Sequence, residues 1–108
     1  MELVERLRRY VSERGAYLVE EVRRLIRMPS VSGTGEGIEE VAAYLRDWIR
    51  ERLGGEAVLL RYGGHPIVYG RLRSPAAQRR VVVYNMYDVQ PPEPLEEWEH
   101  PPFEAALV

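Results

Sequence analysis

The chain contains no cysteine and no lysine. Without cysteine it can form neither a disulfide nor a thiolate metal site, so a metal ion would have to be bound by His, Asp or Glu. It has no apolar run near the roughly 18 residues that a membrane-spanning helix needs, and its start, MELVERLRRY, lacks the apolar segment of a secretion signal. These absences predict a cytoplasmic protein that does not enter a membrane.

The chain also lacks an excess of positive charge, with 15 basic against 17 acidic residues and a net charge of -2. This balance argues against nucleic acid as a partner. All the basic residues are arginine, a thermophile-like bias that fits either a hot habitat or a GC-rich genome. The arginines alternate with apolar residues, which is typical of solvated helix faces rather than of a binding patch.

The length of 108 residues is that of one domain. A chain of this size buries roughly 60 to 70% of the surface that its unfolded form exposes, which is enough for one hydrophobic core. With 45% hydrophobic and 30% charged residues the composition is that of an ordinary globular protein. We therefore predict a single domain over residues 1–108.

Two amphipathic helices are predicted in the first quarter of the chain. Apolar residues recur at helical spacing over residues 3–11, and Gly15 then interrupts the pattern. The same spacing returns over residues 18–26. This second helix should end near Arg27 or Met28, because Pro29 pushes the residue before it out of the helical region.

A third helix is predicted from about Glu36 to Leu53. Its apolar residues form a continuous stripe, and the acidic first turn suits the positive end of the helix dipole. Thr34 is the expected N-cap, and Gly54 and Gly55 supply the stop at the C-terminal end.

The pattern then changes to that of β-strands. Residues 57–62 and 67–72 predict a hairpin that turns at the glycine pair 63–64. Val81–Tyr84 is an unbroken run of the kind found in a strand that is covered on both faces. Helices followed by strands predict an α/β fold class in which the N-terminal helices pack on a β-sheet.

Asp88 follows directly after that last predicted strand. In open α/β sheets ligands bind at the carboxyl ends of the strands, so a carboxylate in this position is well placed for chemistry. Three prolines stiffen the loop that follows, and Trp98 and Phe103 are the expected anchors of this loop. The alternative is that Asp88 is a turn residue that caps its own loop backbone.

Four segments, taken in order, carry a resemblance to a known family: LIRMPSVSG, AAYLRDWIRERLGG, GGHPIVYGRL and YNMYDVQPPEPLEEWEHPPFEA. The chain resembles the N-terminal part of the dinuclear zinc metallopeptidases that include carnosinase-like dipeptidases, aminoacylases, acetylornithine deacetylase and succinyl-diaminopimelate desuccinylase. The last segment resembles the dipeptidase branch, in which a buried strand leads into a His-x-Asp-Val-Gln-Pro loop. The resemblance covers nearly the whole chain.

The resemblance implies a partial zinc-peptidase-like catalytic domain. In the family the His of His-x-Asp binds zinc, and the Asp orients that imidazole and raises its basicity. Asp88 matches the Asp, whereas the His position is Met86, whose thioether is a poor zinc ligand. The family's other zinc ligands and its Glu general base lie downstream of this motif in relatives. We therefore name no confident metal ligand and expect no tight zinc binding by this chain.

Four further residues are weaker candidates for the site. His100 could approach Asp88 from the proline-rich loop, although one His, one Asp and scattered Glu form a poor metal site. His65 lies in GGHPIVYG, a motif that family members often share without using its His as a metal ligand. Tyr87 and Asn85 flank the family's ligand position and are expected to line the cleft, or else to pack on their neighbours.

Three hypotheses follow. The first is the N-terminal part of a zinc-dependent dipeptidase or amide hydrolase, shortened by cloning, by a mis-assigned gene boundary or by a frameshift, and inactive alone, so that a peptide substrate would need the complete enzyme. The second is a stand-alone, non-catalytic module that forms homo-oligomers or binds a partner through an open sheet edge and an apolar face. The third is a degraded site, marked by Met86, whose other ligands lie on another chain.

Overall fold

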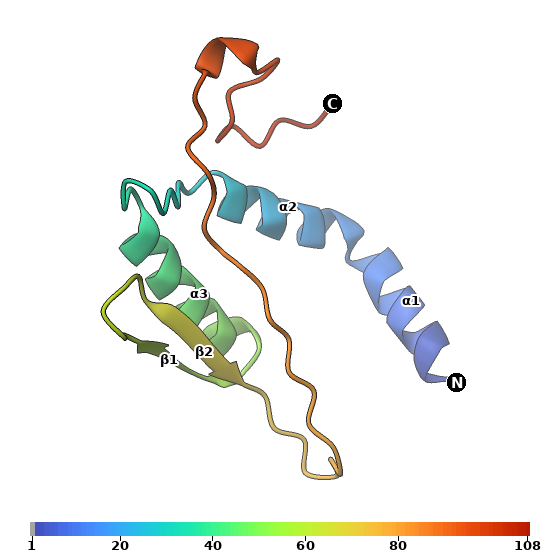
Figure 1. Ribbon diagram of the computed structural model, residues 1–108. Helices are drawn as coiled ribbons and strands as arrows, with labels where there is room; N and C mark the ends of the chain where they lie inside the picture. Colours follow the sequence, from blue (N-terminus) through green and yellow to red (C-terminus); the bar gives the residue numbers. More distant parts are fainter. Residues whose placement is uncertain (1) are drawn as a thin grey trace. The chain divides into compact units, whose positions relative to one another are not determined.

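The computed structural model describes residues 2–108 of the chain (Figure 1). These residues divide into two compact units. One comprises residues 2–28 together with 94–108, and the other comprises residues 29–93. Each unit has its own internal contacts, and the single domain expected over residues 1–108 stays a prediction.

The first unit begins with the two predicted helices, α1 (Leu3–Glu13) and α2 (Gly15–Ile26) (Figure 1). Both confirm the helical spacing read from the sequence, and α2 ends two residues before Met28, as expected from the proline that follows. Neither helix fully buries any of its described side chains. Their apolar faces are therefore open to solvent within the part of the chain that the structure describes.

The carboxyl-terminal segment completes the first unit. It contains a short 3-10 helix, η1 (Leu95–Glu97), and continues as irregular chain to Val108. The guanidinium Nε of Arg23 on α2 donates a hydrogen bond of 2.8 Å to the carbonyl of Ala105. This bond links the last residues of the chain to α2.

The second unit contains helix α3 (Ile38–Arg52), which packs on an antiparallel hairpin of β1 (Glu56–Leu60) and β2 (Ile67–Arg71). The hairpin confirms the predicted strands and their glycine turn, where Gly63 has a φ of +83°. A Cβ added at Gly70 would lie 2.8 Å from Cδ1 of Ile49, so the helix approaches the sheet closely at that point. The arrangement confirms the predicted α/β fold class.

The core of this unit is small and lies where α3 begins and where it meets the hairpin. Its buried apolar side chains are Val31, Ile38, Val41, Ala42 and Ala57. Val31 is central, because its N–H donates to the carbonyl of Glu36 while its own carbonyl accepts the N–H of Gly35. A tight backbone loop therefore closes around a buried valine just before α3.

The start of α3 differs from the sequence-based expectation. The N-cap is Gly37, with a φ of +72°, and no side chain caps the helix. Thr34, the expected N-cap, instead accepts the N–H of Glu36 on its Oγ1 at 3.2 Å, as a turn residue does. The prediction was wrong because glycine can adopt the left-handed conformation, so the loop closes on Gly37 and the helix starts two residues later than Glu36.

The segment Val81–Tyr84 also differs from its prediction as a strand covered on both faces. It is not a strand in this structure, and its four side chains are 78 to 84% exposed. A covered strand needs neighbours, and the two strands among residues 2–108 pair only with each other. The nearest ladder contact is an isolated parallel bridge between Val31 and Val89.

Gly37 should be the least replaceable glycine of this unit. A Cβ at this position would overlap the carbonyl oxygen of Pro29, and its φ is in the left-handed region. We expect Gly37→Ala to lower the free energy of unfolding by on the order of 3 kcal/mol in urea denaturation. Gly63→Ala is the matched control: its φ is also positive but nothing lies within 4 Å, so it should lose only about 1 to 2 kcal/mol. Equal losses would mean that the contact with Pro29 has no effect.

Candidate functional site

Asp88 lies between two backbone groups that Ser30 holds. The Oγ of Ser30 donates a hydrogen bond of 2.8 Å to the carbonyl of Tyr87, and the N–H of Val89 donates one of 2.8 Å to the carbonyl of Ser30. Ser30 itself is buried, with 4% of its surface exposed. The peptide groups on both sides of Asp88 are thus fixed to the segment that leads into α3. We call this arrangement the Ser30 clamp.

Tyr87 adds a side-chain contact to the same junction. Its hydroxyl donates a hydrogen bond to the carbonyl of Pro66, which is buried in the hairpin loop. Burial raises the pKa of the Tyr87 phenol, and the nearby carboxylates of Glu39 and Asp88 raise this pKa further. The Tyr87 phenol is therefore half-buried and bonded to the hairpin loop, and its cleft-lining role stays a prediction.

Met86 and Asp88 lie on the opposite face from Tyr87. Side chains alternate along an extended segment, so the residues on either side of a tyrosine directed at Pro66 point away from that contact. Met86 is 77% exposed, and Asp88 and Asn85 are also exposed. The predicted site residues 85–88 are thus consecutive in one segment, which presents a thioether and a carboxylate to solvent.

The two histidines have different positions. His65 is in the same unit as Asp88, and its Nε2 lies 2.8 Å from the carbonyl oxygen of Ser32. This contact braces the hairpin loop against the start of α3. His100 belongs to the other unit, so its predicted approach to Asp88 stays a prediction.

One ion pair beside this junction was not predicted from the sequence. Glu39 in the first turn of α3 accepts two hydrogen bonds from Arg61, of 2.7 and 2.8 Å. The Arg61 hydrogen bonds lower the pKa of Glu39, and the same contact raises the pKa of Arg61. Both groups are exposed, so the pair's main effect is to place fixed charges near Tyr87. The only hint of this ion pair in the sequence was an acidic residue in the first turn of a helix. Its partner, Arg61, could not be identified because it follows 22 residues later.

The described residues do not fit a zinc site. Residues 2–108 contain no group of three or more His, Cys, Asp or Glu side chains that could hold a metal ion. A catalytic zinc site needs about three protein ligands and a water, whereas this junction offers the thioether of Met86 and the single carboxylate of Asp88. We therefore assign no hydrolytic step to these residues.

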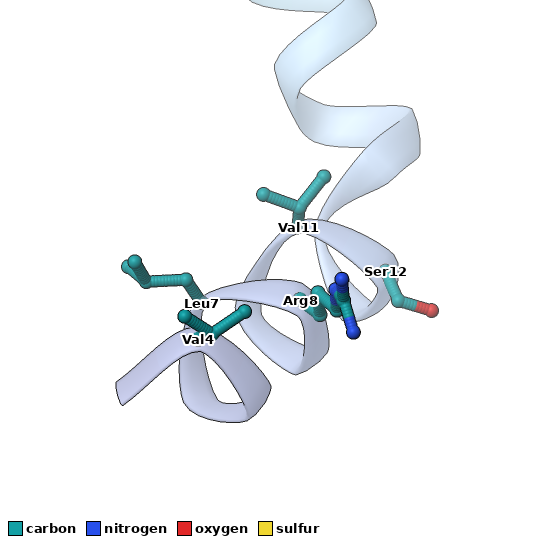
Figure 2. Close-up of a pocket in the computed structure, with 5 residues that line it drawn as sticks. All are labelled: Val4, Leu7, Arg8, Val11 and Ser12. Atoms are coloured by element: carbon teal, nitrogen blue, oxygen red, sulfur yellow. The ribbon is translucent and has the colours of Figure 1, made fainter. Parts of the chain in front are cut away.

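The hollows of the first unit also lack catalytic groups. One lies along α1 and is lined by Val4, Leu7, Arg8, Val11 and Ser12 (Figure 2). The other lies between α2 and the residues around Ala106. Both are open and mainly apolar, so neither competes with the junction as a candidate active site.

None of the helices among residues 2–108 is long and apolar enough to cross a membrane.

Tyr87 should make stability depend on alkaline pH. The folded state raises the pKa of this phenol above the value of about 10 of an unfolded tyrosine. The neutral phenol therefore stabilises the fold below about pH 10, and this contribution is lost as the pH rises through the folded-state pKa. Urea denaturation between about pH 8 and 11 should show this loss in the unmodified chain and a smaller one in Tyr87→Phe.

The control for this measurement is Tyr62→Phe, because Tyr62 is 79% exposed and lies in the same unit. This variant should keep the alkaline loss. At neutral pH Tyr87→Phe should also be less stable than the control by about 1 kcal/mol, since the bond to Pro66 is missing. Identical pH profiles for the two variants would contradict the contribution of Tyr87.

Comparison with known families finds no family model that matches the chain, and no curated protein matches it. Among solved structures, the chain is similar to the M20 family metallo-carboxypeptidase Sso-CP2 from Sulfolobus solfataricus, with 39% identity and a TM-score of 0.76. The match covers 86% of this chain and 20% of that one, so this chain spans about a fifth of its relative. The dipeptidase branch stays a prediction. Over the matched residues, the chain is therefore similar to part of an M20 family metallopeptidase.

Proposed function

We propose that residues 1–108 form the amino-terminal part of a zinc-dependent, dipeptidase-like catalytic domain, and that these residues alone neither bind zinc tightly nor hydrolyse peptides. The observation that carries the proposal is the 39% identity to an M20 metallo-carboxypeptidase over 86% of the chain. The whole enzyme would be a cytoplasmic amide hydrolase, and this chain would form the amino-terminal part of its catalytic domain.

The junction around Asp88 supports this assignment. The Ser30 clamp fixes the peptide groups before and after Asp88, so the position of its carboxylate is set by the fold rather than by a flexible loop. A carboxylate that orients a metal ligand needs this kind of support, because small errors in ligand orientation weaken metal binding. Asp88 would hold such a ligand in place but would not itself carry out hydrolysis.

The proposed inactivity of the isolated chain follows from the side chains that it offers as metal ligands. Met86 stands where the resemblance expects an imidazole, and a neutral thioether neither attracts zinc as strongly nor responds to the carboxylate of Asp88. Without about three ligands no water is activated for attack on an amide. Peptide hydrolysis therefore needs groups other than those described here.

Zinc titration of Met86→His tests the proposal. We expect the unmodified chain to bind no stoichiometric zinc in equilibrium dialysis and to release no product from dipeptides or N-acyl amino acids. Met86→His should bind zinc more tightly than the unmodified chain, though still weakly, because Asp88 is held close enough to orient the new imidazole. The double variant Met86→His/Asp88→Ala should lose most of that gain.

Tyr84→His is the matched control for the added histidine. It lies on the same face of the segment but four residues from Asp88 instead of two, or about 13 Å instead of about 7 Å. It should therefore leave zinc affinity unchanged. Hydrolysis by the unmodified chain that is abolished by a chelator, or equal zinc affinity in both histidine variants, would contradict the proposal.

A second candidate function is a non-catalytic module that associates through an open strand edge. The observation that favours it is the high exposure of Val81–Tyr84, at 78 to 84%, which have no partner strand among residues 2–108.

A further inference from the structure

Tyr87 ties the segment that carries Asp88 to the hairpin through its own side chain. It is half-buried, whereas every other residue from 81 to 90 is exposed. Its hydroxyl donates a hydrogen bond to the carbonyl of Pro66, which is a buried residue of the hairpin loop. One side chain of this segment is therefore anchored in the body of the unit, while its neighbours Met86 and Asp88 face solvent.

The acceptor of this bond lies in a loop that is itself held at two further points. Arg61, at the start of the hairpin loop, donates two hydrogen bonds to Glu39 on α3. Nε2 of His65 lies 2.8 Å from the carbonyl oxygen of Ser32. A hydrogen bond fixes a group only as firmly as its partner is fixed. These two contacts therefore allow the carbonyl of Pro66 to serve as an anchor.

The bond to Pro66 supplies a restraint that the Ser30 clamp lacks. Both bonds of the clamp involve backbone groups on one edge of the segment, the carbonyl of Tyr87 and the N–H of Val89. In an extended chain the side chains stand roughly perpendicular to the direction of these backbone groups. Two bonds on one edge act as a hinge about which the segment can turn. A side chain that is anchored on one face stops this rotation.

We propose that Tyr87 is a positioning residue, whose bond to Pro66 holds the side chains at positions 86 and 88 on the opposite face of the segment. Successive side chains alternate between the two faces, so an anchored Tyr87 leaves both neighbours a single direction. The inference rests on the proposed function in one respect, which is that this opposite face lines the cleft of the complete enzyme. Tyr87 would then shape the cleft from behind instead of lining it.

A pair of introduced histidines, Met86→His/Asp88→His, tests whether the anchor holds these two positions. Residues two apart on one face have Cα atoms about 7 Å apart, so two imidazoles there can bind one Cu(II) ion. The pair should bind Cu(II) at least about tenfold more tightly than either single variant, because the second imidazole is already close. Adding Tyr87→Phe, which removes only the hydroxyl, should weaken this binding about fivefold, since the ligands are no longer held in position.

Electron paramagnetic resonance of the copper titration measures both the affinity and the number of nitrogen ligands, with the unmodified chain as the blank. Val82→His/Tyr84→His is the matched control, because it has the same spacing but lies away from the anchor. Tyr87→Phe should leave the copper affinity of this control unchanged. Equal losses in the two histidine pairs would overturn the proposal.

Ile38→Val controls for a general loss of stability. Ile38 is a core residue with 1% of its surface exposed, so removal of one methyl group destabilises the same unit without altering the segment that carries Asp88. This variant should leave copper binding by the pair at positions 86 and 88 unchanged. If Ile38→Val weakens binding as much as Tyr87→Phe does, the hydroxyl acts only through overall stability and the positioning role is overturned.

Hydrogen exchange at the N–H of Val89 separates the orientation of the segment from its attachment. This N–H is bonded to the carbonyl of Ser30, so its protection reports on the Ser30 clamp. Tyr87→Phe should weaken copper binding while it leaves this protection within about twofold of the original. Protection that falls together with copper affinity would mean that the hydroxyl holds the whole segment, which would overturn a specific role in orientation.

Arg61→Gln tests whether the hairpin loop acts through Tyr87. It removes the ion pair with Glu39 that holds the loop, and should lower the copper affinity of the pair at positions 86 and 88 about twofold. In the Tyr87→Phe background it should have no further effect. Additive losses would overturn the coupling of the loop to Tyr87.

The copper measurements and the proposed function fail separately. Copper binding that is insensitive to Tyr87→Phe would overturn the role of Tyr87 and leave the proposed function standing. Peptide hydrolysis by the unmodified chain would contradict the proposed function, whereas a copper affinity that still depends on the Tyr87 hydroxyl would show that this residue sets the direction of its neighbours.

Discussion

The second unit depends on a single buried serine that bonds to two peptide groups at once. Ser30 is 4% exposed, and a buried hydroxyl that found no acceptor would destabilise the fold. It finds that acceptor in the carbonyl of Tyr87, while its own carbonyl accepts the N–H of Val89. These bonds connect the entry to α3 with a segment 57 residues later in the chain. Together with the bond from the Tyr87 hydroxyl to Pro66, they position Asp88 relative to the helix and hairpin.

The elements that the sequence predicted correctly are those whose signals are local. The helices follow from apolar residues spaced over one turn, and the hairpin follows from two alternating runs around a glycine pair. The start of α3 was missed because it depends on how closely the backbone at Gly37 approaches Pro29, which no composition rule encodes. The run Val81–Tyr84 was misjudged for a related reason. Its residue types record a preference for strand, whereas burial also requires neighbouring strands that the described residues do not provide.

The candidate site was predicted in part, for the same physical reason. Asp88 could be singled out because ligands bind at the carboxyl ends of strands in open α/β sheets and because its loop resembles a known family. The groups that support it could not be found, since each acts across a long stretch of chain. The Tyr87 phenol bonds to a carbonyl 21 residues earlier, and Glu39 pairs with an arginine 22 residues later. Such pairs can be recognised only in the folded structure, where residues that are distant in the sequence lie close together.

The geometry of the junction also explains how methionine can occupy position 86 without disturbing the fold. The Ser30 clamp uses only backbone groups of residues 87 and 89, and Tyr87 turns its side chain away from the face that carries residue 86. Met86 is 77% exposed and is not one of the buried core residues. The fold of this segment is therefore independent of the chemistry displayed on its exposed face. A junction of this kind can keep its backbone shape while it gains or loses a metal ligand, because stability and metal binding are carried by different groups.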